Sequence, residues 1–331
     1  MRPRIAIIGT GGTISSLAAS ETDYVDYPET GQKLSVDQII ARIPQLSDHA
    51  DLVPVPFREV SSSAIGPQDW LRLAAVIETV LSDDPAISGV VILHGTATLE
   101  ETAYFLNLTL KSSQPVVLVG AQRPLNTIGT DAVANAIAAL RAAGHPQSAG
   151  RGVLIVLNDE IHAAREAAKG STYRLHAFHS GAFGPMGTVD PDGVIYSRRP
   201  ERPHTAATPF RVTGETSLPR VDILYAHAGA DEVMVNAALA AGARGLVSAG
   251  FAPGLCSPLE RRALVQAAEA GAVVVQASRV GSGRVSRRGW LRQQGWVAGG
   301  DLSPHKARIL LMLALAHDAS VDFVQDCFDR Y

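Results

Sequence analysis

The sequence predicts an α/β protein in which a mainly parallel sheet is flanked by helices. Short apolar runs, rich in β-branched residues, end at glycine or polar turns at 5–8, 90–93, 116–119 and 153–157. Such runs are continuous rather than alternating, which is typical of strands that are buried on both faces. Helical stretches, for example 68–81 and 131–143, lie between the runs. This strand–helix alternation favours a parallel sheet with helices on both faces.

A break in this alternation predicts two domains joined by a linker. Residues 197–218 are rich in proline, arginine and threonine and show no clear period. Apolar runs resume after them, and the 331 residues are enough for two domains. We therefore expect a larger N-terminal domain at 1–196, a linker at 197–218 and a smaller C-terminal α/β domain at 219–331.

Composition excludes several classes of function. The formal net charge is -3 and aromatic residues make up 5% of the chain, so neither nucleic acid nor a membrane is an expected partner. The two cysteines and ten histidines show no metal-ligand spacing, so we expect free thiols, no metal and no organic cofactor. The N-terminal apolar run is too short for a signal peptide, and no run reaches transmembrane length, which favours a cytoplasmic protein.

The first glycine-rich turn, "GTGGTI" at 9–14, follows the first predicted strand. A phosphate-binding loop needs a Gly-Lys-Ser/Thr sequence, which is absent, and a dinucleotide fingerprint needs a glycine where Ile14 stands. Ligands of parallel sheets bind beyond the carboxyl ends of the strands, so the turn is expected to present Thr13 there. The alternative is that the glycines serve only the backbone.

The second turn, in "VVILHGTATLEETAYFL", repeats the order of strand, glycine, threonine and helix. Thr98 and Glu101 have the spacing of a capping box, which predicts a structural role for Thr98. Thr96 has no such role. Because both turns end strands of one sheet, we expect Thr13 and Thr96 to face the same crevice.

A threonine nucleophile needs a group that removes its proton. The candidates are Tyr24 and Tyr27, shortly after the first turn, and Lys169, after a later strand. A desolvated lysine can act as a base, and the alternative for Lys169 is an ordinary solvated charge.

These motifs together carry a resemblance to a known family. "TGGTI" and "HGT-T-EETAYFL", followed along the chain by "PVVLVGAQRP", "RGVLIVLND", "RPHTAATPF" and "SPHKARILL", resemble the bacterial type I/II L-asparaginases over essentially the whole length. The resemblance implies the two-domain asparaginase-like fold and hydrolysis of the side-chain amide of L-asparagine, or a close relative, through a threonine acyl-enzyme. It also implies a homodimer or homotetramer.

The resemblance assigns roles to individual residues. Thr13 corresponds to the nucleophile, and Tyr27 is preferred to Tyr24 as the tyrosine that assists it. Thr96 and Lys169 correspond to the pair that supports the water and proton transfers. The positions that correspond to substrate-binding residues are Gly12, Ser62, Ser63, Gly95 and Ala97.

Several positions depart from the family pattern. Ala97 replaces the motif aspartate, which in the family binds the substrate α-ammonium group and pairs with the lysine. Ser63 stands where many members have glutamine, and Pro253 where many have asparagine. The stretch that resembles the region supplying a partner's acid has no acid. It carries instead Arg284, Arg287, Arg288 and Arg292, which either face the site or form an exposed basic face.

These departures leave three functions open. The first is an asparaginase whose ammonium recognition uses other residues. The second is a hydrolase of an ω-amide without a free α-amine, such as an N-acyl asparagine or a dicarboxylic half-amide. The third is a non-catalytic protein that binds a small acid. Without the aspartate, the pKa of Lys169 is expected to fall if no other carboxylate lies near it.

Overall fold

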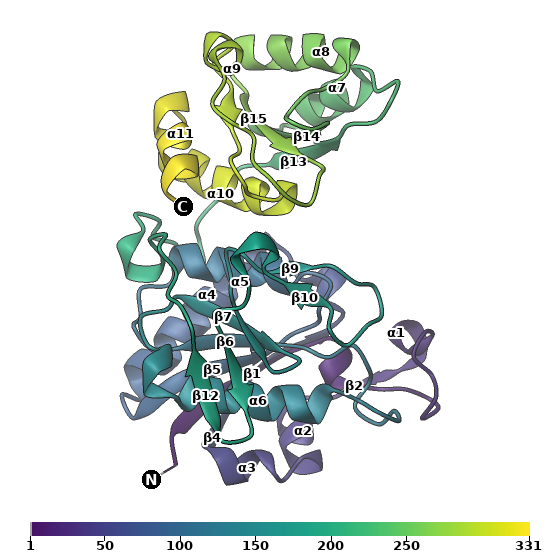
Figure 1. Ribbon diagram of the computed structural model, residues 1–331, viewed down its shortest axis with the longest axis vertical. Helices are drawn as coiled ribbons and strands as arrows, with labels where there is room; N and C mark the ends of the chain where they lie inside the picture. The colour runs from purple at the N-terminus through teal and green to yellow at the C-terminus, as the bar shows by residue number, and fades with distance from the viewer. Residues whose placement is uncertain (1) are drawn as a thin grey trace. The chain divides into compact units, whose positions relative to one another are not determined.

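The computed structural model describes residues 2–331, which form two compact units, one ending at Gly214 and the other spanning Glu215–Tyr331. Each unit contains its own sheet covered by helices (Figure 1). The predicted class, a two-domain α/β protein with the larger unit first, is confirmed. No helix in the described residues has both the length and the apolar character needed to cross a membrane.

The N-terminal unit is built on an eight-stranded sheet in the order β12-β11-β8-β7-β6-β5-β1-β4. The pairings from β4 to β7 are parallel, and those from β7 to β12 are antiparallel. The strands are β1 (Arg4–Gly11), β4 (Asp51–Val60), β5 (Ile87–Leu93), β6 (Val116–Val119), β7 (Val153–Leu157), β8 (Glu160–Ala163), β11 (Gly187–Asp190) and β12 (Gly193–Tyr196).

Helices cover this sheet because its central strands are apolar on both faces. One core joins β1 and β5 to β7 with side chains from α2, α3 and α6, and in Figure 1 α4 and α5 lie on the other side of the sheet. Burying apolar surface on both faces is the main stabilising contribution to such a unit. The helices are α1 (Tyr27–Thr30), α2 (Val36–Arg42), α3 (Leu46–His49), α4 (Pro67–Asp83), α5 (Leu99–Thr109) and α6 (Ala132–Gly144).

Two short antiparallel hairpins stand outside the main sheet. One pairs β2 (Ser16–Leu17) with β3 (Gln32–Lys33), and the other pairs β9 (Ala168–Lys169) with β10 (Phe178–His179). Single 3₁₀ turns follow β1 and the edge strand β4, at Thr13–Ser15 and Ser62–Ala64. The hairpins and turns place side chains near the carboxyl ends of β1 and β5.

The segment after β12 packs on the N-terminal unit. The Lys111 ammonium group donates to the carbonyl oxygens of Thr205 and Thr208, at 3.0 and 3.1 Å, and to the Thr208 hydroxyl at 2.9 Å. Phe210 is buried. Residues 197–214 are thereby tied to the first unit by both polar and apolar contacts.

The C-terminal unit has a parallel four-stranded sheet in the order β13-β14-β15-β16. Its cysteines, Cys256 and Cys327, are free thiols. The strands are β13 (Val221–Tyr225), β14 (Gly245–Gly250), β15 (Val273–Ser278) and β16 (Val297–Ala298). The helices are α7 (Val233–Ala240), α8 (Pro258–Glu269), α9 (Gly289–Gln293), α10 (Pro304–His317) and α11 (Val321–Arg330).

Candidate functional site

Two glycine turns meet at the carboxyl ends of β1 and β5. A Cβ atom on Gly12 would lie 2.1 Å from the Cα of Gly95, so the backbones are in direct contact and only glycine fits. Gly12 also has a φ of 83°, in the left-handed region that favours glycine. Its N–H donates to the Val60 carbonyl oxygen at 2.9 Å. This contact fixes the residues that follow each glycine, Thr13 and Thr96, on one cavity.

The Thr13 hydroxyl is paired with the Tyr27 phenol. The two oxygen atoms are 2.8 Å apart, with Tyr27 at the start of α1. Burial raises the pKa of Tyr27, although its hydrogen bond with Thr13 works against that shift. Tyr24, the other candidate, points its hydroxyl elsewhere and donates to the Ile128 carbonyl oxygen at 2.9 Å.

The Thr96 hydroxyl is paired with the Lys169 ammonium group. Their Oγ1 and Nζ atoms are 2.7 Å apart, and the same Nζ lies 3.4 Å from the Gln122 Oε1. Burial lowers the pKa of Lys169, while the nearby Glu100 carboxylate opposes that shift, so the condition attached to the prediction, that no other carboxylate lies near, is not met. Glu100 also accepts the Lys169 backbone N–H at 3.1 Å, which fixes the strand that carries the lysine.

A cavity of about 270 Å³ brings most of the sequence-predicted residues together. Ser63 is not among its lining residues. Ser63 is exposed, and its hydroxyl lies 2.9 Å from that of Ser61, which does line the cavity. The predicted residues that line it are Gly12, Thr13, Tyr27, Ser62, Gly95, Thr96, Ala97 and Lys169, and Tyr24 lines it as well.

Other lining residues were not singled out from the sequence. Gln122 lies just past β6, the neighbour of β5, so its position at a strand end was a usable signal. Lys33 reaches the cavity from the β2–β3 hairpin, and Thr172 and Tyr173 reach it from the β9–β10 hairpin. These hairpins have two-residue strands, which leave no periodic signal.

A buried histidine, His94, supports the glycine turn after β5 through hydrogen bonds. His94 donates from Nδ1 to the Gly95 carbonyl oxygen at 2.8 Å, because a carbonyl can only accept. Its Nε2 therefore accepts from the Thr102 hydroxyl at 3.0 Å, and that hydroxyl oxygen accepts from the Trp70 indole N–H at 3.0 Å. Every group in this chain of bonds is satisfied by neutral His94, and burial lowers its pKa to about 4.

The expected capping box at the start of α5 is wrong. Thr98 is the N-cap residue, but its side chain accepts no hydrogen bond from the helix backbone. Its hydroxyl instead donates to the Ser62 carbonyl oxygen at 2.8 Å. Thr98 is therefore structural, as expected, but it joins two loops of the site rather than capping the helix.

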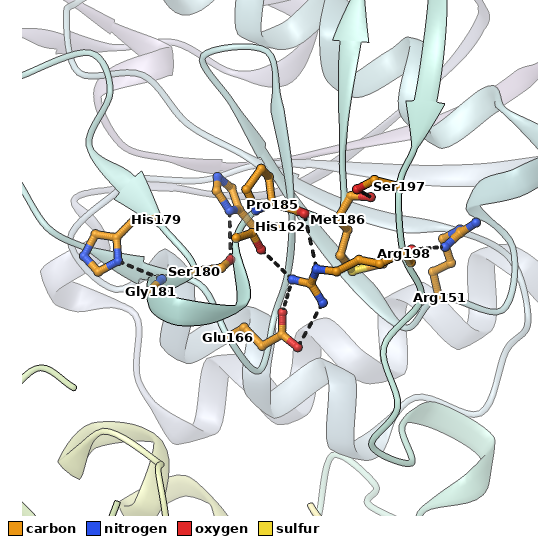
Figure 2. A network of polar contacts seen from close by, with 11 residues as sticks. Arg151, His162, Glu166, His179, Ser180, Gly181, Pro185, Met186, Ser197 and Arg198 are labelled. Carbon is orange, nitrogen blue, oxygen red and sulfur yellow. Dashed lines mark hydrogen bonds and ion pairs between the residues drawn. The ribbon is translucent and has the colours of Figure 1, made fainter. Parts of the chain in front are cut away.

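A polar network supports the segment that leads to Lys169. Figure 2 shows the Arg198 guanidinium bound to both carboxylate oxygens of Glu166, three residues before the lysine, and to the Pro185 carbonyl oxygen. The Glu166 side chain is 10% exposed. In the same network, His162 Nδ1 lies 2.9 Å from the Ser180 hydroxyl oxygen. This network anchors the turn between β8 and β9.

The four arginines predicted either to face the site or to form an exposed basic face differ in their contacts. Arg288 donates to the Gly254 carbonyl oxygen at 2.6 Å, and Arg287 lies 3.8 Å from the Asp329 carboxylate. Arg284, Arg287 and Arg292 are exposed.

Comparison with known proteins shows the family to which this chain belongs. Residues 4–202 match the family model "Asparaginase, N-terminal", and residues 220–328 match "Glutaminase/Asparaginase C-terminal domain". The chain therefore belongs to the asparaginase family of amidohydrolases.

Named relatives match along nearly the whole chain. The chain is 39% identical to "Probable L-asparaginase periplasmic" of Haemophilus influenzae and 38% identical to "L-asparaginase 2" of Escherichia coli, covering 99% of this chain and 93% of each relative. The crystal structure of a probable cytoplasmic L-asparaginase from Campylobacter jejuni matches with a TM-score of 0.95, 37% identity and full coverage of both chains.

Proposed function

We propose that this protein hydrolyses the side-chain carboxamide of L-asparagine, or of a close relative, with Thr13 as nucleophile. The observation that carries the proposal is the pair of short contacts on one cavity, Thr13 with Tyr27 at 2.8 Å and Thr96 with Lys169 at 2.7 Å. Two hydroxyl groups, each held by a group able to move a proton, match the needs of a two-step acyl transfer.

In the first step the Thr13 oxygen attacks the carboxamide carbon. The C–N bond breaks, ammonia leaves with the proton lost by Thr13, and an ester remains on Thr13. Tyr27, like an ordinary tyrosine, is a neutral phenol at neutral pH, and burial raises its pKa further, so it orients the Thr13 hydroxyl and relays its proton.

In the second step water attacks the ester carbon and restores the Thr13 hydroxyl. The lowered pKa of Lys169 increases the fraction of the side chain that is a neutral amine. That amine takes a proton from water through Thr96. Backbone N–H groups at the turns are candidates to stabilise the oxyanion of both steps.

The test of the nucleophile is ammonia release from a panel of small amides by Thr13→Ala, with Thr13→Ser as the matched control. We expect Thr13→Ala to lose about 1,000-fold or more in kcat, and Thr13→Ser to retain measurable turnover. Mass spectrometry of the quenched wild-type reaction should detect an acyl group on Thr13. Unchanged ammonia release by Thr13→Ala would refute the proposal.

The role of Lys169 has a separate test in the pH–rate profile. Because the neutral amine is the active form, kcat should rise with pH through a midpoint below the ordinary lysine value of 10.5. Lys169→Met should remove this rise and reduce turnover. A wild-type profile without any rise below that value would contradict the assignment.

We also propose a cytoplasmic location and a homodimer or homotetramer. The location is supported by the name of the Campylobacter jejuni neighbour, whereas the Haemophilus influenzae relative is named periplasmic. The assembly rests on resemblance to the family. Cell fractionation tests the first, and size-exclusion chromatography with light scattering tests the second.

A further inference from the structure

The ionic side chains that line the candidate catalytic cavity are both lysines. Lys33 enters from β3 and Lys169 from β9. Among the described residues that line the cavity there is no aspartate and no glutamate. A ligand in the cavity therefore meets positive charge at contact distance.

Neither lysine is neutralised by a carboxylate at contact distance. The Lys33 ammonium group donates to the Ser16 hydroxyl at 2.8 Å, directly across the β2–β3 hairpin. The Lys169 ammonium group contacts the oxygen atoms of Thr96 and Gln122. Within the described part of the chain neither lysine forms an ion pair, so Lys33 remains able to bind an anion, and Lys169 adds positive charge whenever it is protonated.

The nearest acids lie behind the cavity wall or are already occupied. Glu100 is buried and contacts the backbone of Lys169 rather than the cavity. Asp23 accepts the N–H groups of Val25 and Asp26, at 3.1 and 2.8 Å. Burial lowers the pKa of Lys33, and Glu29, which does not line the cavity, opposes that shift. These carboxylates moderate the positive potential without offering a ligand cation a partner.

A substrate ammonium group would be poorly compensated in this cavity. Moving a cation out of water without a carboxylate partner is unfavourable, and two nearby ammonium groups add repulsion. Ala97 presents an exposed methyl group to the cavity, which cannot form an ion pair. The same surroundings favour a ligand carboxylate, which can contact Lys33.

The mouth of the cavity offers apolar surface instead. Val25 is 63% exposed and Tyr173 is 68% exposed, and both line the cavity. Pro28 and the ring of Tyr24 belong to the same lining. An apolar substituent on the substrate would cover these side chains and remove them from water, which is favourable.

We propose that the preferred substrate is an anionic ω-carboxamide whose α-carbon carries no free ammonium group. The α-nitrogen is either acylated, with the acyl group against Val25 and Tyr173, or absent, as in a dicarboxylic half-amide. This inference rests on the proposed amide hydrolysis at Thr13 and concerns only which amide is split.

The test compares kcat/KM at pH 7.5 for L-asparagine, N-acetyl-L-asparagine, N-isovaleryl-L-asparagine and succinamate. We expect kcat/KM for at least one substrate without an ammonium group to exceed that for L-asparagine by about 10-fold or more. A 10-fold ratio corresponds to a difference of about 1.4 kcal/mol in activation free energy. A higher value for the isovaleryl than for the acetyl compound identifies the acylated substrate, and a higher value for succinamate identifies the half-amide. A ratio below 10-fold for every compound overturns the proposal.

A charge-changing variant tests the cause of the preference. Ala97→Asp should raise kcat/KM for L-asparagine relative to succinamate by about 10-fold or more, whereas Ala97→Asn, similar in size but uncharged, should change the ratio less than 3-fold. Lys33→Gln provides a second variant and should shift the ratio in the same direction. Unchanged ratios in Ala97→Asp and Lys33→Gln would overturn the electrostatic reasoning.

The failure of this inference is distinguishable from that of the proposed function. Thr13-dependent ammonia release with L-asparagine as the best substrate overturns only the inference. Loss of ammonia release from every amide, with binding of the same compounds retained in calorimetry, overturns the proposed function itself.

Discussion

Acid should destabilise the N-terminal unit well before its carboxylates are protonated. Burial lowers the pKa of His94 and of His162 to about 4 from the ordinary 6.5, with Glu160 opposing the shift at His162. A base with a depressed pKa contributes stability that is present above pH 6.5 and is lost as pH falls towards 4, because only the unfolded chain takes up the proton in that window.

The size of the effect follows from these pKa values. Between pH 7 and pH 5, a shift from 6.5 to about 4 reduces the free energy of unfolding by about 2 kcal/mol for each histidine. The two histidines together therefore give a loss of about 4 kcal/mol, a large part of the stability of an ordinary domain.

The assay is urea unfolding at pH 7, 6 and 5, followed by the fluorescence of Trp70. Trp290 and Trp296 are replaced by phenylalanine, so that Trp70 is the sole reporter of the three tryptophans. His94→Gln should lower the free energy of unfolding at pH 7. It should also make that free energy depend less steeply on pH, because about one proton fewer is taken up on unfolding. His227→Gln, at an exposed histidine of the other unit, should leave the pH dependence of the free energy of unfolding unchanged. A loss below about 1 kcal/mol between pH 7 and 5 would refute the reasoning.

Three further changes have defined outcomes. Gly12→Ala places a Cβ 2.1 Å from the Gly95 Cα, and the displaced turn should cost about 100-fold in kcat/KM for ammonia release. Arg198→Ala leaves the Glu166 carboxylate buried without its partner and should cost about 2–4 kcal/mol in urea unfolding, with Arg198→Lys intermediate. Lys111→Met removes the ammonium donor of the Thr208 carbonyl oxygen, while the Thr205 carbonyl oxygen keeps the Thr208 N–H, and should cost about 1–3 kcal/mol in the same assay; an unchanged midpoint would show that water replaces the lysine.

The central sheet and the meeting of the two threonines were predictable because they follow from repeated local patterns. Continuous β-branched runs identify the buried strands, and parallel strands end at one edge of the sheet. The glycines after β1 and β5 then place Thr13 and Thr96 at that edge. Nothing in this inference depends on a contact between distant loops.

The remainder of the site depends on such contacts. The choice between Tyr24 and Tyr27 turns on which hydroxyl reaches Thr13, and the intervening loop has no period to set its direction. Lys33 reaches the cavity through a hairpin with two-residue strands, which is too short to recognise in the sequence. Thr98 matched a capping pattern, but a tertiary hydrogen bond to Ser62 took its hydroxyl instead.

Because the backbones of Gly12 and Gly95 are in direct contact, the placement of the two threonine hydroxyl groups and the selectivity for a substrate depend on different parts of this enzyme. The hydroxyl groups of Thr13 and Thr96, which we propose take part in the reaction, are placed by main chain at the carboxyl ends of β1 and β5, whereas the charge and shape that a ligand meets come largely from side chains on surrounding loops. Selectivity can therefore diverge, in evolution or by engineering, through replacements in those loops while the reacting geometry stays as it is.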